Sequence, residues 1–521
     1  MNALANSRIP QLLRWTMLAV AAILFALHFA HLNADFPNHS PWLDRAKYTD
    51  EGWYSDAATR HFQLGHWYVP GDFNPATALP VWPLIESVPF ALFGASITVA
   101  RACAVTIFGL ICAASWLLLY RWRDPNMKGQ PRSVAPELAV LLLNTSPFCY
   151  AFFRMAVLEP PLILLVLLAL VAVTRTRNHP AAVRPLLILG ALLPTIILTK
   201  TTGIAIFPAI AWLLWECIEP AQNASRVAIF FRKAAIASAV AVALAVIYIF
   251  AITHAHLAAD AKNVFAANAY RINRHNAFGA LINGLKDFRW AGTILIPLAI
   301  AVLTALIRPR RNPLVLSLLL WATAYFAFIV YHGSRQPRYY LPVFVPLILL
   351  LAHIAARPFF RCNSTPRKLL AAATALALFA IVTLEARQTL HYALHPDYTF
   401  LAAARQIRST MAADLDHSPL LMSPSGSDIS LFTGVPTVGD LFTLLPPDQL
   451  AQQYQPGWLA LYIPLEAPTR DALALNFHLQ EAGRFHIMDD PALDTLILYR
   501  ISPATDIRYD RPQVQRLIPN P

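Results

Sequence analysis

Charged residues and cysteine are both scarce in this chain of 521 residues. Only 13% of the residues are charged, whereas 57% are hydrophobic. This composition predicts a chain built mainly of apolar spans, and so a polytopic membrane protein. The five cysteines show no Cys-x-x-Cys spacing, so we expect neither a disulfide framework nor a zinc motif. The chain also lacks a glycine-rich phosphate loop of the kind that binds nucleotides.

The formal net charge of +12 does not indicate a nucleic-acid-binding protein. The basic residues occur in short clusters between apolar runs, which is the pattern of membrane orientation. Positive residues near the ends of membrane spans stay in the cytoplasm, so each cluster marks a cytoplasmic loop. We therefore expect the lipid bilayer, and no nucleic acid, among the partners.

The apolar runs and basic clusters together predict about eleven transmembrane helices, several of them only marginally long enough to cross. The first run, residues 11–31, lacks the small-residue cleavage pattern of a signal peptide. We expect it to be a retained span with its amino end in the cytoplasm. The other spans are predicted at residues 95–120, 134–150, 155–173, 185–199, 203–217, 234–252, 291–307, 314–331, 340–356 and 369–389.

Two long loops are predicted on the outer side of the membrane, within a transmembrane domain of residues 1–390. The first, residues 32–94, is polar and contains tryptophans and tyrosines that suit the headgroup level. Its apolar stretch at residues 81–94 is short and contains two prolines and a glutamate. We expect this stretch to lie at the membrane surface as an interfacial helix. The second long outer loop is residues 253–290.

Beyond residue 390 the apolar runs shorten to five or six residues and alternate with turns that contain proline, glycine and aspartate. This pattern favours a soluble α/β domain over residues 391–521, which the predicted topology places outside. We expect it to pack against the outer loops or to contact an acceptor. Helices are predicted at residues 402–411 and 469–482, and strands at 420–422, 458–463 and 495–500.

Three carboxylates lie close together in the first outer loop, at Asp50, Glu51 and Asp56. On a helix Asp50 and Glu51 diverge by about 100°, whereas we expect Asp50 and Asp56 near one face after roughly two turns. A carboxylate at this place can act as a general base or as a metal ligand. A helix start with acidic residues favoured by the helix dipole explains the stretch equally well at this point.

The predicted topology sends further ionisable residues to the same outer side. Such groups beside a bilayer are costly unless they are paired or used, so carboxylates facing basic residues favour an anionic ligand such as a lipid phosphate. Alternatives remain open: Arg154 and Glu159 can form an ion pair that braces two helices, and Lys200 or Arg338 can reach toward the headgroups. The residues are Arg154, Glu159, Lys200, Arg271, Arg274, Lys286, Arg335 and Arg338.

Four short motifs follow one another along residues 10–390. They are Asp50-Glu51, Arg154-Met155-Ala156-Val157-Leu158-Glu159-Pro160, Leu198-Thr199-Lys200-Thr201-Thr202-Gly203, and Arg338-Tyr339-Tyr340-Leu341-Pro342. In their order and their predicted membrane side, these motifs resemble the C-type glycosyltransferases. That superfamily of lipid-linked sugar transferases includes aminoarabinose transferase of lipid A and the protein O-mannosyltransferases. The resemblance implies a C-type glycosyltransferase fold.

The resemblance also implies transfer of a sugar from a polyprenyl-phosphate carrier, undecaprenyl phosphate in a bacterium, with inversion. The acceptor would be a lipid, glycan or protein on the periplasmic side of the inner membrane. Asp50, with Glu51 beside it, would be catalytic, and Lys200 and Arg338 would hold the phosphate. The further substrate-binding residues expected at the site are Tyr339, Arg271, Arg274, Arg154, Glu159 and Asp56. A flippase of lipid-linked glycans and a non-catalytic envelope-assembly relative remain as alternatives, although charges gathered at one membrane face favour the transferase.

One segment departs from the aminoarabinose transferases. Those enzymes have Glu-Lys-Pro-Pro late in the first loop, whereas this chain has Asn74-Pro75-Ala76-Thr77-Ala78-Leu79-Pro80. In those enzymes the acid contributes to a metal site and the lysine to substrate binding, and both are missing here. The resemblance therefore leaves open whether a divalent metal ion is bound, and we do not expect lipid A as the acceptor.

Overall fold

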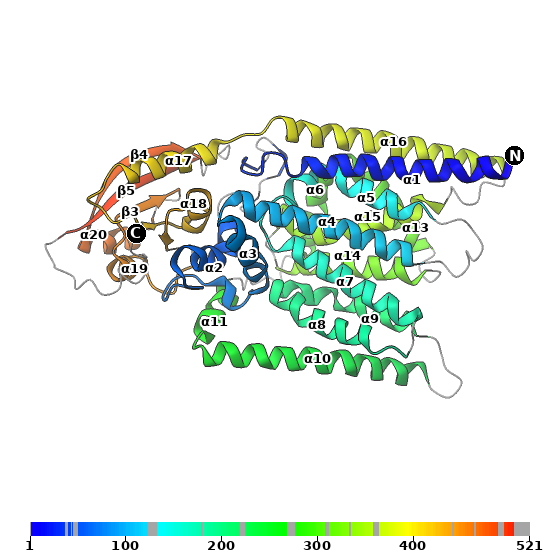
Figure 1. Cartoon of the computed structure of the whole chain (residues 1–521), viewed down its shortest axis with the longest axis horizontal. Helices are drawn as coiled ribbons and strands as arrows, with labels where there is room; N and C mark the ends of the chain where they lie inside the picture. Colours follow the sequence, from blue (N-terminus) through cyan, green and yellow to red (C-terminus); the bar gives the residue numbers. More distant parts are fainter. Residues whose placement is uncertain are drawn as a thin grey trace.

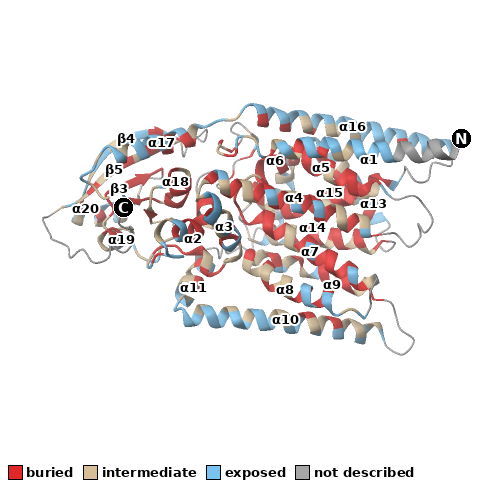
Figure 2. Cartoon of the chain, in the orientation of Figure 1, coloured by how far each residue is buried: buried red, intermediate tan, exposed pale blue. Residues whose placement is uncertain are grey.

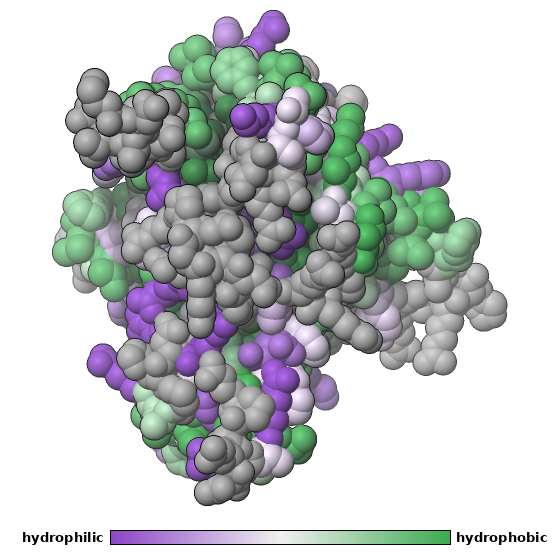
Figure 3. All heavy atoms as spheres, turned by 90° about the vertical axis from the view of Figure 1, so that its right-hand side faces the viewer, coloured by the Kyte–Doolittle hydropathy of each residue, from purple (hydrophilic) through white to green (hydrophobic). Residues whose placement is uncertain are grey.

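The computed structural model comprises a helical bundle with a smaller sheet-containing unit at one end (Figure 1). The N-terminus lies at the end of the bundle that is farther from this unit. Seen from that end, both hydrophilic patches and hydrophobic side chains reach the surface (Figure 3). The structure describes residues 2–36, 40–42, 44, 50–122, 133–178, 181–218, 225–267, 277–307, 312–332, 335–357, 364–439, 442–462, 465–487 and 494–504.

The bundle helices differ sharply in burial. Helix α15 lies inside the bundle and is buried nearly throughout, whereas α10 lies along one flank and is exposed along most of its length (Figure 2). Both are apolar, and in a membrane protein exposed apolar side chains face lipid. The bundle contains α1 (Asn2–Leu27), α4 (Ile97–Arg121), α5 (Ala135–Thr145), α6 (Pro147–Phe152), α7 (Glu159–Asn178), α8 (Arg184–Thr199), α9 (Phe207–Glu216), α10 (Arg226–His254), α13 (Leu295–Ile307), α14 (Pro313–His332), α15 (Leu341–Ala355) and α16 (Thr365–Leu394).

The protein is a multi-span membrane protein. In the described part of the chain, six helices are long and apolar enough to cross a membrane, or seven if the bent pair 278–289 and 291–307 forms one span. The predicted number of eleven is larger because four further predicted spans correspond to apolar helices of fewer than 18 residues. These shorter helices are Gln11–Leu27, Ala135–Thr145, Arg184–Thr199 and Thr201–Glu216.

The predicted span at residues 134–150 is two helices, because the chain turns at Ser146. This residue is extended, as is favoured for a residue that precedes proline, and Pro147 begins α6. The Ser146 side chain accepts a hydrogen bond from the Cys149 N–H and so caps the second helix.

Short helices of the two long loops that are predicted to be outer, among them α2, α3 and α11, lie between the bundle and the sheet-containing unit (Figure 1). Helix α3 buries Trp82, Glu86 and Phe90 and exposes Leu84 and Leu92, an amphipathic pattern that suits the predicted place at the membrane surface. The elements of these loops are α2 (Asp50–Leu64), η2 (Pro75–Thr77), α3 (Val81–Phe93), α11 (Ala258–Ala267) and α12 (Ala277–Lys286). The remaining short helices are η4 (Thr201–Ile206), η6 (Asp287–Ile294) and η8 (Pro337–Tyr340).

The C-terminal unit contains a mixed five-stranded sheet in the order β2-β1-β3-β5-β4. Strand β1 pairs in parallel with β2 and β3, while β5 pairs antiparallel with β3 and β4, with Trp458 opposite Arg500. The same unit contains four helices, α17, α18, α19 and α20. The elements are α17 (Thr399–Ala412), β1 (Leu421–Met422), α18 (Gly426–Thr433), β2 (Thr437–Val438), α19 (Pro447–Tyr454), β3 (Trp458–Leu461), α20 (Ala467–Asn476), β4 (Phe477–His486) and β5 (Thr495–Pro503).

One predicted helix of this unit is partly wrong. The helix predicted at residues 469–482 ends at Asn476, and Phe477–His486 forms strand β4. This segment contains good helix formers, but pairing along the whole of β5 outweighs the local preference. The three predicted strands are present as β1, β3 and β5.

Candidate active site

Helix α2 carries Asp50 in its first turn and is held closely by the C-terminal unit. The Gly52 N–H donates a hydrogen bond of 2.7 Å to Oδ1 of Asp428. A Cβ at position 52 would lie 2.2 Å from the backbone nitrogen of Asp428, so only glycine fits this contact. The start of α2 is thus fixed against α18.

A buried group of charged residues surrounds Asp50, and we call Arg338, Asp44, Asp50, Glu159 and Lys200 the Arg338 cluster. The Arg338 guanidinium donates to both Asp44 and Asp50, and its Nε lies 4.0 Å from Oε1 of Glu159. The Lys200 ammonium donates to the same Glu159 oxygen. The Arg338 backbone N–H adds a hydrogen bond of 3.0 Å to Asp44. These groups come from the first loop and from the ends of three bundle helices.

Local turns place the two cations beside one tyrosine. Lys200 is extended between α8 and η4, and a Cβ at Gly203 would lie 2.4 Å from the Ile196 side chain, so this turn is tightly packed. The Lys200 ammonium lies 4.2 Å from the centre of the Tyr339 ring, and the Arg338 guanidinium carbon lies 4.7 Å from it. Both distances suit cation–π contacts.

The surroundings of Asp50 make its carboxylate a stronger base. Burial has the largest influence and raises the pKa of Asp50, while Arg338 lowers it. The neighbouring carboxylates of Asp44 and Glu159 raise the pKa further, and Lys200 opposes them. The net result is a raised pKa, which is the direction that makes a carboxylate a better general base.

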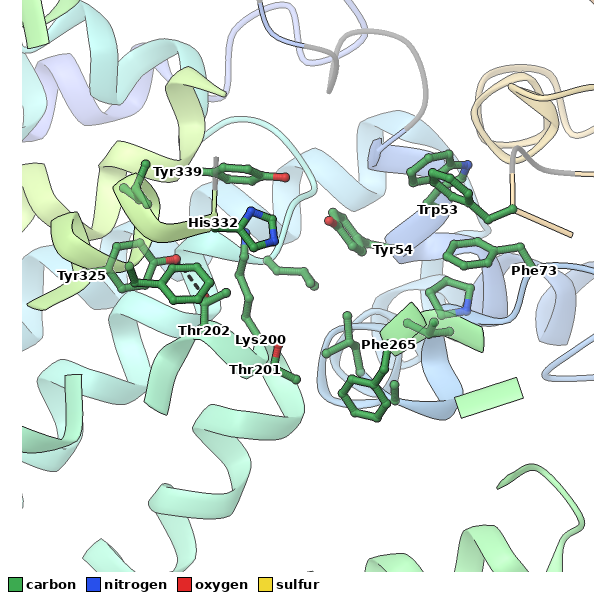
Figure 4. Close-up of a pocket in the computed structure, with 18 residues that line it drawn as sticks. Trp53, Tyr54, Phe73, Lys200, Thr201, Thr202, Phe265, Tyr325, His332 and Tyr339 are labelled. Atoms are coloured by element: carbon green, nitrogen blue, oxygen red, sulfur yellow. Dashed lines mark hydrogen bonds between the residues drawn. The ribbon is translucent and has the colours of Figure 1, made fainter. Parts of the chain in front are cut away.

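A cavity of about 270 Å³ adjoins the Arg338 cluster. Its bundle side includes Lys200, Tyr339 and a hydrogen-bonded pair, Thr202 and Tyr325, at 2.9 Å (Figure 4). The opposite side is formed by the first loop, by α11 and by Phe442 of the C-terminal unit, and Tyr54 points into the space from there. The other aromatic rings on that side are those of Trp53, Phe73, Phe265 and Phe442.

The segment that departs from the aminoarabinose transferases forms part of this cavity wall. Pro75, Ala78 and Leu79 all line the space. The side chains at these three positions therefore offer apolar surface to a ligand. The absence of the Glu-Lys-Pro-Pro motif therefore makes this part of the cavity wall apolar.

Comparison with solved structures gives the fold. ArnT from Cupriavidus metallidurans bound to undecaprenyl phosphate matches with a TM-score of 0.56 and 18% identity, over 93% of this chain and 97% of that chain. The apo form of ArnT gives a TM-score of 0.55 over the same shares. The chain has the C-type glycosyltransferase fold. Mycobacterial arabinofuranosyltransferase AftD also matches, with a TM-score of 0.52 and 13% identity, over 94% of this chain and 40% of that chain. No protein-family model and no curated protein matches the sequence.

In this C-type fold, five of the predicted site residues come together: Asp50, Glu159, Lys200, Arg338 and Tyr339. Glu51 does not join them. Its carboxylate binds Arg101 through bonds of 2.9 and 2.5 Å and accepts a 2.9 Å hydrogen bond from the Ala156 N–H. Glu51 therefore connects the first loop to α4 and to the segment that precedes α7.

The structure contradicts the alternative in which Arg154 and Glu159 form an ion pair. Arg154 donates to the Tyr150 hydroxyl and to the Ala30 and His31 carbonyls, the latter two at 2.6 and 2.9 Å. Glu159 pairs with Lys200 instead. Arg154 lies in the turn between α6 and α7, and its side chain reaches the segment that follows α1.

The expectation that Asp50 and Asp56 share one face of α2 is also wrong. Asp56 pairs with Arg60 at 3.0 Å and accepts a hydrogen bond of 2.9 Å from the Ser427 hydroxyl. Six residues at about 100° each leave the two side chains about 120° apart. Arg271 and Arg274 lie outside the described residues, so their predicted roles stay predictions.

Asp44 and Tyr54 also belong to the site, although their place in it was not predicted from the sequence. Nothing in the sequence signals that Asp44 pairs with Arg338, which lies 294 residues away. Tyr54 follows Asp50 by four residues, and this spacing places the two side chains on one face of a helix. Within the described ranges no group of three or more His, Cys, Asp or Glu residues is arranged to hold a metal ion.

Proposed function

We propose that the protein is an integral membrane glycosyltransferase that moves a sugar from a polyprenyl-phosphate carrier to a cell-envelope acceptor, with inversion. One observation carries the proposal: an aromatic cavity adjoins a buried cluster that contains both a carboxylate of raised pKa and a lysine. The C-type fold supports it, and the ArnT structure that matches was solved with undecaprenyl phosphate bound.

Lys200 is the residue that we assign to the donor phosphate. Lys200 lines the cavity, and a phosphate bound there would compete with Glu159 for the Lys200 ammonium. Arg338 and Asp50 lie behind Lys200, with 3% and 6% of their side chains exposed, and neither of them lines the cavity. We therefore propose that Arg338 orients Asp50, and that its positive charge acts on the phosphate over a longer distance.

The chemical step is a single displacement. Asp50 takes the proton of an acceptor hydroxyl while that oxygen attacks the anomeric carbon, and the bond from this carbon to the phosphate oxygen breaks. The electron pair goes to the phosphate, and Lys200 stabilises the charge that develops there. Attack opposite the leaving group inverts the anomeric carbon. No nucleotide is required, because the phosphate carrier already activates the sugar.

We further propose that the amino end is cytoplasmic and that the site and the C-terminal domain, residues 391–521, are periplasmic in the inner membrane. The N-terminus and the C-terminal unit at opposite ends of the bundle support this orientation (Figure 1). We propose about eleven crossings, with the four shorter apolar helices completing the bundle. The site would then open at the outer membrane surface.

Turnover of polyprenyl-phosphate-linked sugars by the purified protein in lipid tests this function. The measurement is release of polyprenyl phosphate from a panel of donors and acceptors, with and without a chelator. We expect release by the wild type and loss of release in Asp50→Asn. If the panel yields no release while the protein moves lipid-linked glycan between leaflets, the protein is a flippase and the proposal fails. The chelator decides whether a divalent metal ion is needed.

A further inference from the structure

Helix α18 of the C-terminal unit packs directly on the first turns of α2. The contact is backbone to backbone at Gly52, where an added Cβ would lie 2.2 Å from the Asp428 nitrogen and 2.3 Å from the Ser427 carbonyl carbon. It continues along α2, because Ser427 donates to Asp56 at 2.9 Å and Ser430 donates to Gln63 at 3.1 Å. The C-terminal unit therefore follows α2 from its beginning to its last turn.

Asp428 supplies a hydrogen-bond acceptor that α2 cannot provide for itself. The first four N–H groups of an α-helix have no partner within the helix, and Gly52 is the third residue of α2. Its N–H donates to Oδ1 of Asp428 at 2.7 Å, and only 3% of Asp428 is exposed. A negative charge at this end also interacts favourably with the helix dipole. Asp428 thus serves as a helix cap from 376 residues away.

We propose that Asp428 is a positioning residue that holds the carboxylate of Asp50 in its working geometry. The idea rests on the proposed function, because it assigns Asp428 a role in the same reaction. Asp50 lies two residues before Gly52 and is bound by Arg338 on the bundle side. The first turn of α2 is therefore held from two sides, by the bundle at Asp50 and by α18 at Gly52. The C-terminal domain then contributes to catalysis by fixing α2, in addition to the aromatic wall that its Phe442 gives to the cavity.

Loss of the cap is expected to release the first turn of α2. The unpaired Gly52 N–H would favour fraying, and the Asp50 side chain would move relative to the cavity. A displacement of about 1 Å at a catalytic group can lower a rate about 100-fold. Donor binding depends on Lys200 and the cavity wall, so it is expected to change little.

The test compares three variants of the full-length protein in lipid: Asp428→Ala, Asp428→Asn and, as a control, Asp471→Asn. Asparagine keeps an oxygen that can accept the Gly52 hydrogen bond, whereas alanine does not. Asp471 lies in the same unit, with 71% of its side chain exposed. The two measurements are hydrogen–deuterium exchange of peptides covering residues 50–56 and steady-state release of polyprenyl phosphate.

In Asp428→Ala we expect exchange at the start of α2 to be at least about tenfold faster, kcat to fall about 10- to 100-fold, and the donor KM to stay within about twofold. Asp428→Asn should retain most of the activity, and Asp471→Asn should match the wild type.

Unchanged exchange in Asp428→Ala overturns the cap, whatever the activity. Faster exchange with unchanged kcat overturns the positioning role, as does a loss of activity in Asp428→Asn equal to that in Asp428→Ala. A wild type without turnover instead refutes the proposed function, and the exchange measurement still decides whether Asp428 caps α2.

Discussion

Helix α2 reaches two buried charged clusters, and the two differ in what surrounds them. The first is the Arg338 cluster, which adjoins the aromatic cavity. The second, which we call the Arg60 cluster, consists of Arg60, Asp56 and Asp72. It is closed between the first outer loop and the C-terminal unit, where the Gly439 N–H donates to Asp72 at 2.9 Å.

The comparison shows that burial and ion pairing do not by themselves mark a functional site. The side chains of the Arg60 cluster are as deeply buried as those of the Arg338 cluster. What distinguishes the Arg338 cluster is that one member, Lys200, lines the aromatic cavity, whereas Arg60, Asp56 and Asp72 do not line it. We therefore expect mutations in the Arg338 cluster to lower turnover and mutations in the Arg60 cluster to lower stability.

The largest difference between the clusters is expected from the same substitution at their two α2 carboxylates. Asp50→Asn keeps an oxygen for Arg338 but removes the base, so we expect kcat to fall about 10²- to 10⁴-fold. Asp56→Asn should retain turnover per folded molecule. Both are measured as release of polyprenyl phosphate. If both variants lose the same share of turnover, proximity to the cavity does not distinguish a functional cluster from a structural one.

A smaller loss is expected from Lys200→Ala. Removing the ammonium that faces the donor phosphate should lower turnover about 100-fold, because one group that stabilises a developing charge contributes about this much. The matched control is Lys262→Ala, which changes an exposed lysine of α11. Turnover of Lys200→Ala at the wild-type rate would remove Lys200 from the reaction and leave its bond to Glu159 as a structural contact.

In the Arg60 cluster, Arg60→Met is expected to destabilise the fold. Arg60 binds Asp56 at 3.0 Å and Asp72 at 2.6 Å, so its removal leaves two buried carboxylates without this cation. Breaking a buried ion pair on one side typically costs about 3–5 kcal/mol. The measurement is the denaturation midpoint in detergent. An inactive variant with unchanged stability would instead place the Arg60 cluster in the active site.

The sequence predicted four of the five residues of the Arg338 cluster, because a membrane constrains the ends of its spans. Basic clusters assign each span end to one side, so Asp50, Glu159, Lys200 and Arg338 could be placed at the same surface. A different signal, short apolar runs separated by turns, predicted the α/β character of the C-terminal unit. Neither result requires knowledge of which helices are neighbours.

The pairing of side chains could not be predicted, because it depends on how the helices are arranged within the membrane plane. Topology placed Arg154 and Glu159 together, yet the rotation of the two segments sends Arg154 to Tyr150 and Glu159 to Lys200. Asp44 was missed because its partner is distant in sequence. The packing of α18 on α2 at Gly52 is likewise a contact between distant segments, and it has no local pattern.

The smallest expected difference between the clusters is in the pH dependence of stability. Burial raises the pKa of Asp56 to about 6 from its ordinary value of 3.8, although Arg60 opposes this. The folded state therefore binds this proton more tightly than the unfolded state does. Between about pH 4 and pH 6, stability should fall as the pH rises, by roughly 3 kcal/mol across this window. The measurement is the thermal midpoint of wild type and Asp56→Asn at several pH values.

The comparison between wild type and Asp56→Asn isolates this proton from others that titrate nearby. Burial also raises the pKa of Asp50, so the wild type alone would show a decrease in stability from both clusters. Only the part that disappears in Asp56→Asn belongs to the Arg60 cluster. If the decrease is the same in both proteins, Asp56 stays ionised throughout, and Arg60 then outweighs burial in setting its charge. The Arg60 cluster would in that case differ from the Arg338 cluster in charge state as well as in access to a ligand.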